Sequence, residues 1–177
     1  MTQKMPDYLE QEDIDELLET AKAYNFRDYL LLNFMWRTGA RVSEAISVTP
    51  NDIELRRNVV NIRHAKGGKQ RRALLDEKTI KQLLRYIKKE GIGKNEPIFG
   101  IHRTQVFNII KKYGAMIGVN IHPHTLRHSF AIFAIRSGVD IRRLSMMLGH
   151  SSIAITQVYL QFNDDDLREA YEKMSFA

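Results

Sequence analysis

The sequence predicts a mainly α-helical domain that carries one small, three-stranded antiparallel sheet. Apolar residues recur with a helical period over most of the 177 residues, and the period changes only between residues 52 and 75. A Gly67-Gly68 pair interrupts this stretch and is a strong signal for a β-hairpin. The 44% of hydrophobic residues suffices for one well-buried domain and hardly for two. We therefore expect a single domain over residues 1–177.

Two helices are expected near the N-terminus. Apolar residues from Ile14 to Tyr24 fall at helical spacing, and acidic residues enrich the turn before them. The next helix, about 27–36, is apolar nearly all round, as is typical of a helix at the centre of a core. Thr38-Gly39 ends it, and a short helix is expected to begin near Val42.

Three short strands follow, and then the helical period returns. The strands are predicted at 53–55, 59–64 and 70–75, and the last two flank the hairpin tip. Helices are predicted at residues 77–89, 104–116, 124–137 and 141–148. Gly91 and Gly138 follow two of these helices in the position of C-caps.

The C-terminal segment, 163–177, predicts one more helix. Asn163 is suited to cap it, and the three aspartates that follow suit the positive end of the helix dipole. A narrow apolar stripe runs along this helix at i, i+3, i+4 and i+7, formed by Leu167, Ala170, Tyr171 and Met174. The helix either packs on its own domain or is exchanged with a neighbouring subunit.

Composition narrows the classes of partner and compartment. A net charge of +6 and a pI near 9.5 favour a polyanionic partner, although charge alone does not decide this. The absence of cysteine excludes a disulfide framework and thiolate zinc sites. The sequence has no apolar signal core at its start and no stretch near the roughly 20 apolar residues of a membrane span. We expect a soluble cytoplasmic protein without membrane contact.

Two arginines are candidate anion ligands. Arginine offers a planar fork that grips two phosphate oxygens at once. Arg41 follows the Thr38-Gly39 turn, and Glu44 is placed to orient its guanidinium; taken alone, Arg41 fits a surface salt bridge better. Arg127 lies at the edge of an apolar helical stripe, so partial burial is expected. A buried charge needs a partner, here either a phosphate or an internal carboxylate.

Histidines surround Arg127 in the sequence. His124 lies three residues before it, on the same helix face, near a helix N-terminus that favours an anion. We interpret His124 as a proton acceptor or phosphate donor and His150 as a second donor. His122 and His128 are interpreted as structural or peripheral. A metal site is not expected, because no carboxylate or cysteine stands close to these histidines.

Tyr159 is the candidate nucleophile. Taken alone, it is better explained as a core aromatic. A phenol is a poor nucleophile at neutral pH unless a base takes its proton and cations stabilise the developing charge. The arginines and histidines described above are suited to do both.

Basic residues gather around the predicted hairpin. Lys66 at its tip is either a solvated turn lysine or a mobile ammonium that reaches a leaving oxygen. Lys69, Arg71 and Arg72 extend the positive surface. We expect these three to contact backbone phosphates, which gives affinity without sequence discrimination.

Five segments, in order and spacing, resemble the tyrosine recombinase (phage integrase) family, especially its compact Xer-type members. They are Thr38-Gly-Ala-Arg41-Val-Ser-Glu44, Ala65-Lys66-Gly-Gly-Lys-Gln-Arg71, Pro123-His124-Thr-Leu-Arg127-His-Ser-Phe, Leu148-Gly-His150-Ser-Ser and Thr156-Gln-Val-Tyr159. Any one of them is weak, whereas the ordered set is highly specific. The resemblance runs from about Tyr8 to the C-terminus and implies the tyrosine recombinase catalytic-domain fold, with a core at about 8–162.

The resemblance also implies a reaction. Arg41 and Arg127 would clamp the scissile phosphate, with His124 and His150 completing the pocket. Lys66 would protonate the leaving 5′ oxygen, and Tyr159 would attack to form a 3′-phosphotyrosyl link. The family then implies a site-specific DNA recombinase that needs no cofactor. Its partners would be double-stranded DNA and further recombinase subunits, as a tetramer in the synapse.

Two departures from the family pattern are visible. Family members usually carry a separate N-terminal core-binding domain, and we expect this domain to be absent here, either because the chain is truncated or because it is a naturally short version. Leu74 stands where a proline is frequent, a change expected to be harmless. Two alternatives remain, a non-catalytic DNA-binding module or regulator that keeps the fold, and a relaxing enzyme like type IB topoisomerases. The biological role is integration, excision or dimer resolution.

Overall fold

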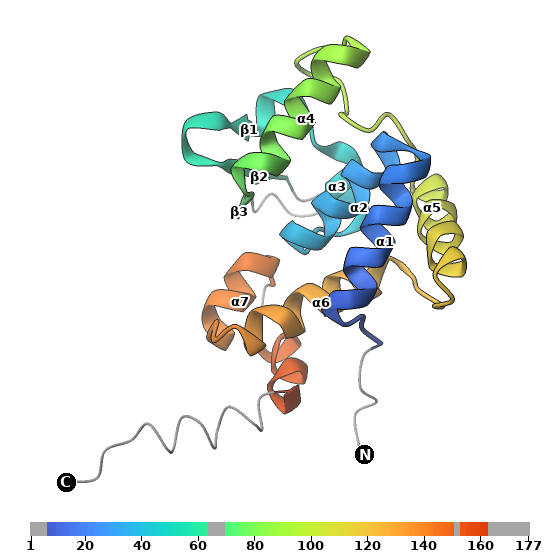
Figure 1. Ribbon diagram of the computed structural model, residues 1–177. Helices are drawn as coiled ribbons and strands as arrows, with labels where there is room; N and C mark the ends of the chain where they lie inside the picture. Colours follow the sequence, from blue (N-terminus) through green and yellow to red (C-terminus); the bar gives the residue numbers. More distant parts are fainter. Residues whose placement is uncertain (1–6, 64–69, 151–152, 163–177) are drawn as a thin grey trace, which may run out of the picture.

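The computed structural model describes residues 7–63, 70–150 and 153–162. The predicted hairpin tip and the predicted C-terminal helix lie outside these ranges. Within them the chain is mainly helical with a three-stranded sheet, as the sequence predicts (Figure 1). The α-helices are α1 (Gln11–Tyr24), α2 (Phe26–Thr38), α3 (Val42–Ser47), α4 (Glu77–Glu90), α5 (Arg103–Met116), α6 (Pro123–Arg136) and α7 (Ile141–Leu148). Short 3-10 turns are η1 (Pro50–Asp52), η2 (Leu55–Arg57), η3 (Ile153–Ile155) and η4 (Gln157–Phe162).

The helix α2 is the centre of the core. Its apolar run is buried on all sides, as its sequence predicts, and it packs against α1, α4 and α6. The side chain of Asn25 caps its start by accepting from the Asp28 amide. At the other end, Thr38 Oγ1 donates to the Phe34 carbonyl, and Gly39 ends the helix in the left-handed conformation. The end of α2 is thereby held at a defined position in the interior.

The sheet is an antiparallel meander in the order β1-β2-β3. Its strands are β1 (Ile53–Glu54), β2 (Val59–Ile62) and β3 (Arg71–Leu74). The first strand is shorter than predicted, because Leu55 opens the turn η2, and Asn58 at φ 53° reverses the chain. The register places Ile62 opposite Arg71 and Val59 opposite Leu74. Side chains of β3 alternate, so Arg71 is buried and Leu74 exposed.

The segment that precedes α1 is tied to α6. The amide of Leu9 donates to Ser129 Oγ at 2.8 Å, and that hydroxyl donates to the Thr125 carbonyl. Arg136 forms an ion pair with Glu10 at 2.7 Å. The helix α6 is thus fixed against both α2 and the N-terminal segment, and Figure 1 shows it beside α7 at one end of the molecule.

In the part of the chain that the structure describes, none of the helices is both long and apolar enough to cross a membrane.

Gly39 is required by space as well as by backbone conformation. Its φ is +59°, and a Cβ placed there would lie 2.7 Å from Phe130 and 2.8 Å from Leu148. Gly91, at the end of α4, has a similar φ of +66°, but a Cβ placed there would meet nothing within 4 Å. A side chain at position 91 would therefore meet only the unfavourable backbone conformation, whereas one at position 39 would also clash with its neighbours.

We predict that Gly39→Ala destabilises the protein more than Gly91→Ala. The left-handed conformation costs an alanine about 1–2 kcal/mol at either position. Crowding against α6 and α7 adds about 1–3 kcal/mol at position 39 alone. Urea unfolding of both variants measures the difference. Equal losses in the free energy of unfolding would show that the side chains at the junction of α2, α6 and α7 move aside without cost, and the prediction would then be wrong.

Candidate active site

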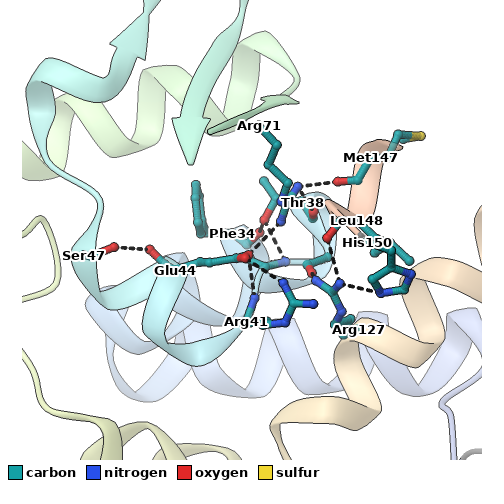
Figure 2. A network of polar contacts seen from close by, with 12 residues as sticks. Phe34, Thr38, Arg41, Glu44, Ser47, Arg71, Arg127, Met147, Leu148 and His150 are labelled. Carbon is teal, nitrogen blue, oxygen red and sulfur yellow. Dashed lines mark hydrogen bonds and ion pairs between the residues drawn. The ribbon is translucent and has the colours of Figure 1, made fainter. Parts of the chain in front are cut away.

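Five polar side chains converge beside the ends of α2 and α7 (Figure 2). They are Arg41, Glu44, Arg71, Arg127 and His150. Arg41 and Glu44 stand at the start of α3, Arg71 on β3, Arg127 on α6, and His150 just after α7. The structure therefore brings together residues that the sequence separates by more than a hundred positions.

Glu44 lies at the centre of this cluster, with a side chain only 1% exposed. Its Oε1 accepts from Arg41 Nη1, and its Oε2 accepts from the Arg41 amide and from Arg71 Nη2, each at 3.0 Å. Burial raises the pKa of this carboxyl, but Arg71 and the Arg41 amide outweigh that effect and hold the pKa below its usual value. Glu44 is thus ionised at neutral pH and fixes the direction of Arg41.

Arg127 is almost fully buried, at 4% exposure. Nη1 donates to the Gly39 carbonyl, while Nη2 donates to the Leu148 carbonyl at 2.8 Å and lies 2.9 Å from His150 Nε2. Its partners are thus backbone carbonyls rather than the internal carboxylate considered above. Burial and the positive charge of Arg41 lower the pKa of Arg127 to about 10, so it remains a cation at neutral pH.

Arg71 lies inside the protein, which corrects the expectation that it extends the positive surface. It is 6% exposed, whereas its neighbour Arg72 is turned outward by the strand alternation and pairs with Glu54 at 3.0 Å. Arg71 instead donates to Glu44 and to two backbone carbonyls. Lys66 and Lys69 lie outside the described residues.

The carbonyls bound by Arg71 and Arg127 lie at the C-terminal ends of two helices. They are the carbonyls of Thr38 and Gly39 at the end of α2, and of Met147 and Leu148 at the end of α7. The last carbonyls of a helix lack intrahelical partners and carry the negative end of its dipole. A guanidinium is therefore favoured at this point, and each of the two arginines joins α2 to α7.

His150 is held as a neutral ring. Its Nδ1 lies 2.7 Å from Thr156 Oγ1 and its Nε2 lies 2.9 Å from Arg127. Burial, followed by the charges of Arg127 and Arg41, lowers the pKa of His150 to about 4. A guanidinium can only donate, so the arrangement assigns Nε2 as the acceptor and Nδ1–H as the donor to Thr156.

Tyr159 contacts His128, a histidine that the sequence indicated as structural or peripheral. The Tyr159 ring is 3% exposed, and its Oη lies 2.6 Å from Nδ1 of His128. Burial and the adjacent His124 lower the pKa of His128 to about 4, so its Nδ1 accepts the phenolic hydrogen. Burial raises the pKa of Tyr159, and the charge of Arg127 opposes this rise. The phenol is therefore a neutral hydroxyl that already points at a proton acceptor.

His122 and His124 stand at the start of α6. His124 is exposed in the first turn, and His122 precedes the helix as its cap residue. Partial burial, His122 and Arg127 lower the pKa of His124. The His124 and His128 ring centroids are 6.2 Å apart, as their i, i+4 spacing requires. That spacing was the available sequence signal for His128.

The site combines a cluster of positive charges that can bind an anion with the Tyr159 hydroxyl, which is held by His128. Three guanidinium groups, those of Arg41, Arg71 and Arg127, surround one carboxylate, so the cluster carries an excess of two positive charges. The Arg41 side chain is 37% exposed and can reach a ligand from solution.

Over residues 7–63, 70–150 and 153–162, no group of three or more His, Asp or Glu side chains could hold a metal ion.

Comparisons with a protein family, with curated relatives and with solved structures all point to the same group of proteins. Residues 7–166 match the phage integrase family. A tyrosine recombinase of Pseudothermotoga lettingae is 38% identical over 177 residues, covering 97% of this chain and 62% of the relative. A crystal structure of XerA recombinase matches with a TM-score of 0.82 at 30% identity, covering 98% of this chain and 68% of XerA. A structure of XerH bound to palindromic difH substrate shares the fold, with a TM-score of 0.83 at 24% identity over 96% of this chain and 54% of XerH. This chain spans about three fifths of the length of the curated relatives.

We predict that the imidazoles of His128 and His150 titrate near pH 4 in the folded protein. In the unfolded chain both should titrate near their ordinary value of about 6.5. The unfolded state then binds more protons between these values, so the free energy of unfolding should fall as the pH is lowered from 6.5 towards 4. Ring resonances in NMR and urea unfolding across this range measure both effects. Titration of either ring near 6.5 in the folded state would contradict the assignment.

Proposed function

The chain belongs to the phage integrase family of tyrosine recombinases, and we propose that it cleaves and rejoins DNA strands through a 3′-phosphotyrosyl intermediate. The observation that carries the proposal is the excess positive charge around Glu44 together with the Tyr159 hydroxyl bonded to a neutral imidazole. The reaction serves site-specific recombination, namely integration, excision or dimer resolution.

Arg41 and Arg127 bind the scissile phosphate. Arg41 reaches it from solution, and the buried charge of Arg127 acts where water is excluded and its field is strong. Preorganised donors of this kind stabilise the charge that develops on the phosphate oxygens without rearranging. His124 and His150 complete the pocket, since both rings lie close enough to Arg41 and Arg127 for these charges to lower their pKa values.

The covalent step exchanges one phosphodiester for another. Tyr159 Oη attacks the phosphorus and forms the P–O bond, while the bond from phosphorus to the 5′ oxygen breaks. The phenolic proton passes to Nδ1 of His128, the acceptor in contact with it, in place of the His124 suggested by the sequence. Lys66 gives a proton to the departing 5′ oxygen. Because the phosphotyrosyl link conserves the energy of the original bond, the reverse attack rejoins the strand without a cofactor.

Double-stranded DNA is the proposed partner. XerH, which shares the fold, has been solved with its difH substrate. The exposed Arg72 and the basic residue Lys69, which precedes β3 in the sequence, would contact backbone phosphates along such a duplex. Strand exchange requires further subunits, and we assign the C-terminal segment 163–177 to contacts between them in a tetrameric synapse.

Tyr159→Phe is expected to abolish the covalent adduct and leave DNA affinity nearly unchanged. The substitution removes the nucleophilic oxygen but keeps the buried ring. The measurement is a denaturing gel of protein trapped on a nicked suicide duplex, with DNA affinity determined in parallel. Tyr29→Phe is the matched control, because it removes the hydroxyl of another buried tyrosine that bonds only Gln82 in the described structure. An adduct that persists in Tyr159→Phe assigns the nucleophile elsewhere, whereas no adduct in the unaltered protein favours a non-catalytic DNA-binding module.

Lys66→Ala is expected to cleave ordinary DNA about 10²–10⁴-fold more slowly, as loss of a general acid does. A strand with sulfur in place of the bridging 5′ oxygen releases a weakly basic thiolate that hardly needs the proton. Lys66→Ala should therefore regain most of its activity on this strand, and Arg127→Ala should not. An equal defect on both substrates would make Lys66 a phosphate-positioning residue and Lys69 the next candidate acid.

A further inference from the structure

The role of Arg71 is not explained by contact with DNA. It is one of two adjacent arginines on β3, and the strand alternation gives them opposite environments. The Arg72 side chain is 51% exposed, whereas that of Arg71 is 5% exposed. A buried guanidinium cannot join the outer basic surface, so its charge must act inside the protein.

Arg71 contacts three parts of the chain that carry the site. Its Nη2 donates to Glu44 Oε2 at 3.0 Å, and its Nη1 donates to the Thr38 carbonyl at 3.1 Å and to the Met147 carbonyl. Figure 2 shows these bonds meeting at one guanidinium. Glu44 holds Arg41, while the helix ends at Thr38 and Met147 adjoin the carbonyls that hold Arg127.

Stability alone does not account for this placement. Burial of the guanidinium lowers the pKa of Arg71, which reports the cost of removing its charge from water. Within the described residues its Nε also has no hydrogen-bond partner, and an unpaired buried N–H is unfavourable. A well-packed apolar side chain of similar size at this position would avoid both costs.

We propose that Arg71 is a positioning residue for DNA cleavage, acting through Glu44 and the ends of α2 and α7 to aim Arg41 and Arg127 at one phosphate. The inference rests on the proposed function. It differs from a DNA contact because it predicts a defect in the rate of cleavage and not in affinity. It differs from a stabilising contact because it depends on the ionisation of Glu44.

The charge of Glu44 provides a specific signature. Among the described residues, the groups that act on it include Arg41 from the start of α3, Arg71 from β3 and Arg127 from α6. Burial raises the pKa of Glu44, and Arg71 is the largest influence that opposes it. Without Arg71, the pKa of Glu44 should rise, and the carboxyl should gain a proton as the pH falls. Arg41 then loses its counter-ion, so cleavage should weaken towards acid pH.

The experiment compares Arg71→Met with Arg72→Met, the same substitution one residue along the strand. Single-turnover cleavage of a suicide duplex is measured with protein in excess between pH 5.5 and 8.5, and affinity is measured on the uncleaved duplex. For Arg71→Met we expect cleavage at saturation to drop about 10²-fold, the scale of misplacing a reacting group, with affinity little changed. Its rate relative to the unaltered protein should fall further as the pH is lowered. Arg72→Met should weaken affinity, as loss of a phosphate contact does. Arg57→Met, at an exposed arginine outside the site, should leave cleavage at saturation unchanged.

Two further variants keep the test valid if Arg71→Met folds poorly. Arg71→Lys keeps the charge but not the planar fork, so it should cleave at an intermediate rate. The double variant Glu44→Gln/Arg71→Met removes both charges of the buried pair, and its relative rate should be independent of pH.

Normal cleavage at saturation in Arg71→Met, or a loss confined to affinity, would overturn the proposal. A reduced rate whose ratio to the unaltered protein does not change with pH would leave only a structural role and would overturn it as well. Failure of the unaltered protein to form any adduct would instead remove the proposed function.

Discussion

Two arginines buried at the carbonyl ends of two helices link the elements that carry the site. A guanidinium in the interior is tolerated only where its N–H groups and its charge find partners. Arg71 and Arg127 find them where α2 and α7 end side by side. Each arginine comes from a third element, β3 or α6, so neither is satisfied until these elements have assembled. Gly39 permits the junction, because it leaves room for the Phe130 and Leu148 side chains.

The charges of the arginines also influence which groups of the site carry a proton. Glu44 stays ionised because Arg71 lies beside it, whereas His128 and His150 stay neutral through burial and nearby positive charges. The free protein thus holds donors, an acceptor and a hydroxyl in the states that the proposed attack on a phosphodiester requires. A site arranged in advance need not reorganise when the charge on the phosphate develops.

Much of this arrangement could be predicted from sequence. The change of period marked the sheet, the capping residues marked helix ends, and the spacing of Arg41 and Glu44 indicated their contact. The burial of Arg71 could not be predicted, because a basic run at a hairpin does not tell which of two neighbouring arginines turns inward. That choice depends on strand register and on Glu44, 27 positions away. His128 was missed because its partner Tyr159 comes 31 residues later on a 3-10 turn that has no periodic signal. Leu55 was assigned to a strand because its apolar character gave no sign of the turn η2 that it opens.

The buried arginines should be held rigidly before any DNA is present. NMR of the guanidinium groups in the free protein is the sharpest test. Fast rotation about the Nε–Cζ bond averages the two Nη signals of an arginine, whereas restricted rotation keeps them separate. We predict separate Nη signals and restricted motion for Arg71 and Arg127, with a single averaged signal for the exposed Arg57. Averaged signals for Arg71 and Arg127, like those of Arg57, would contradict this rigidity and would mean that the site becomes ordered only when a ligand binds.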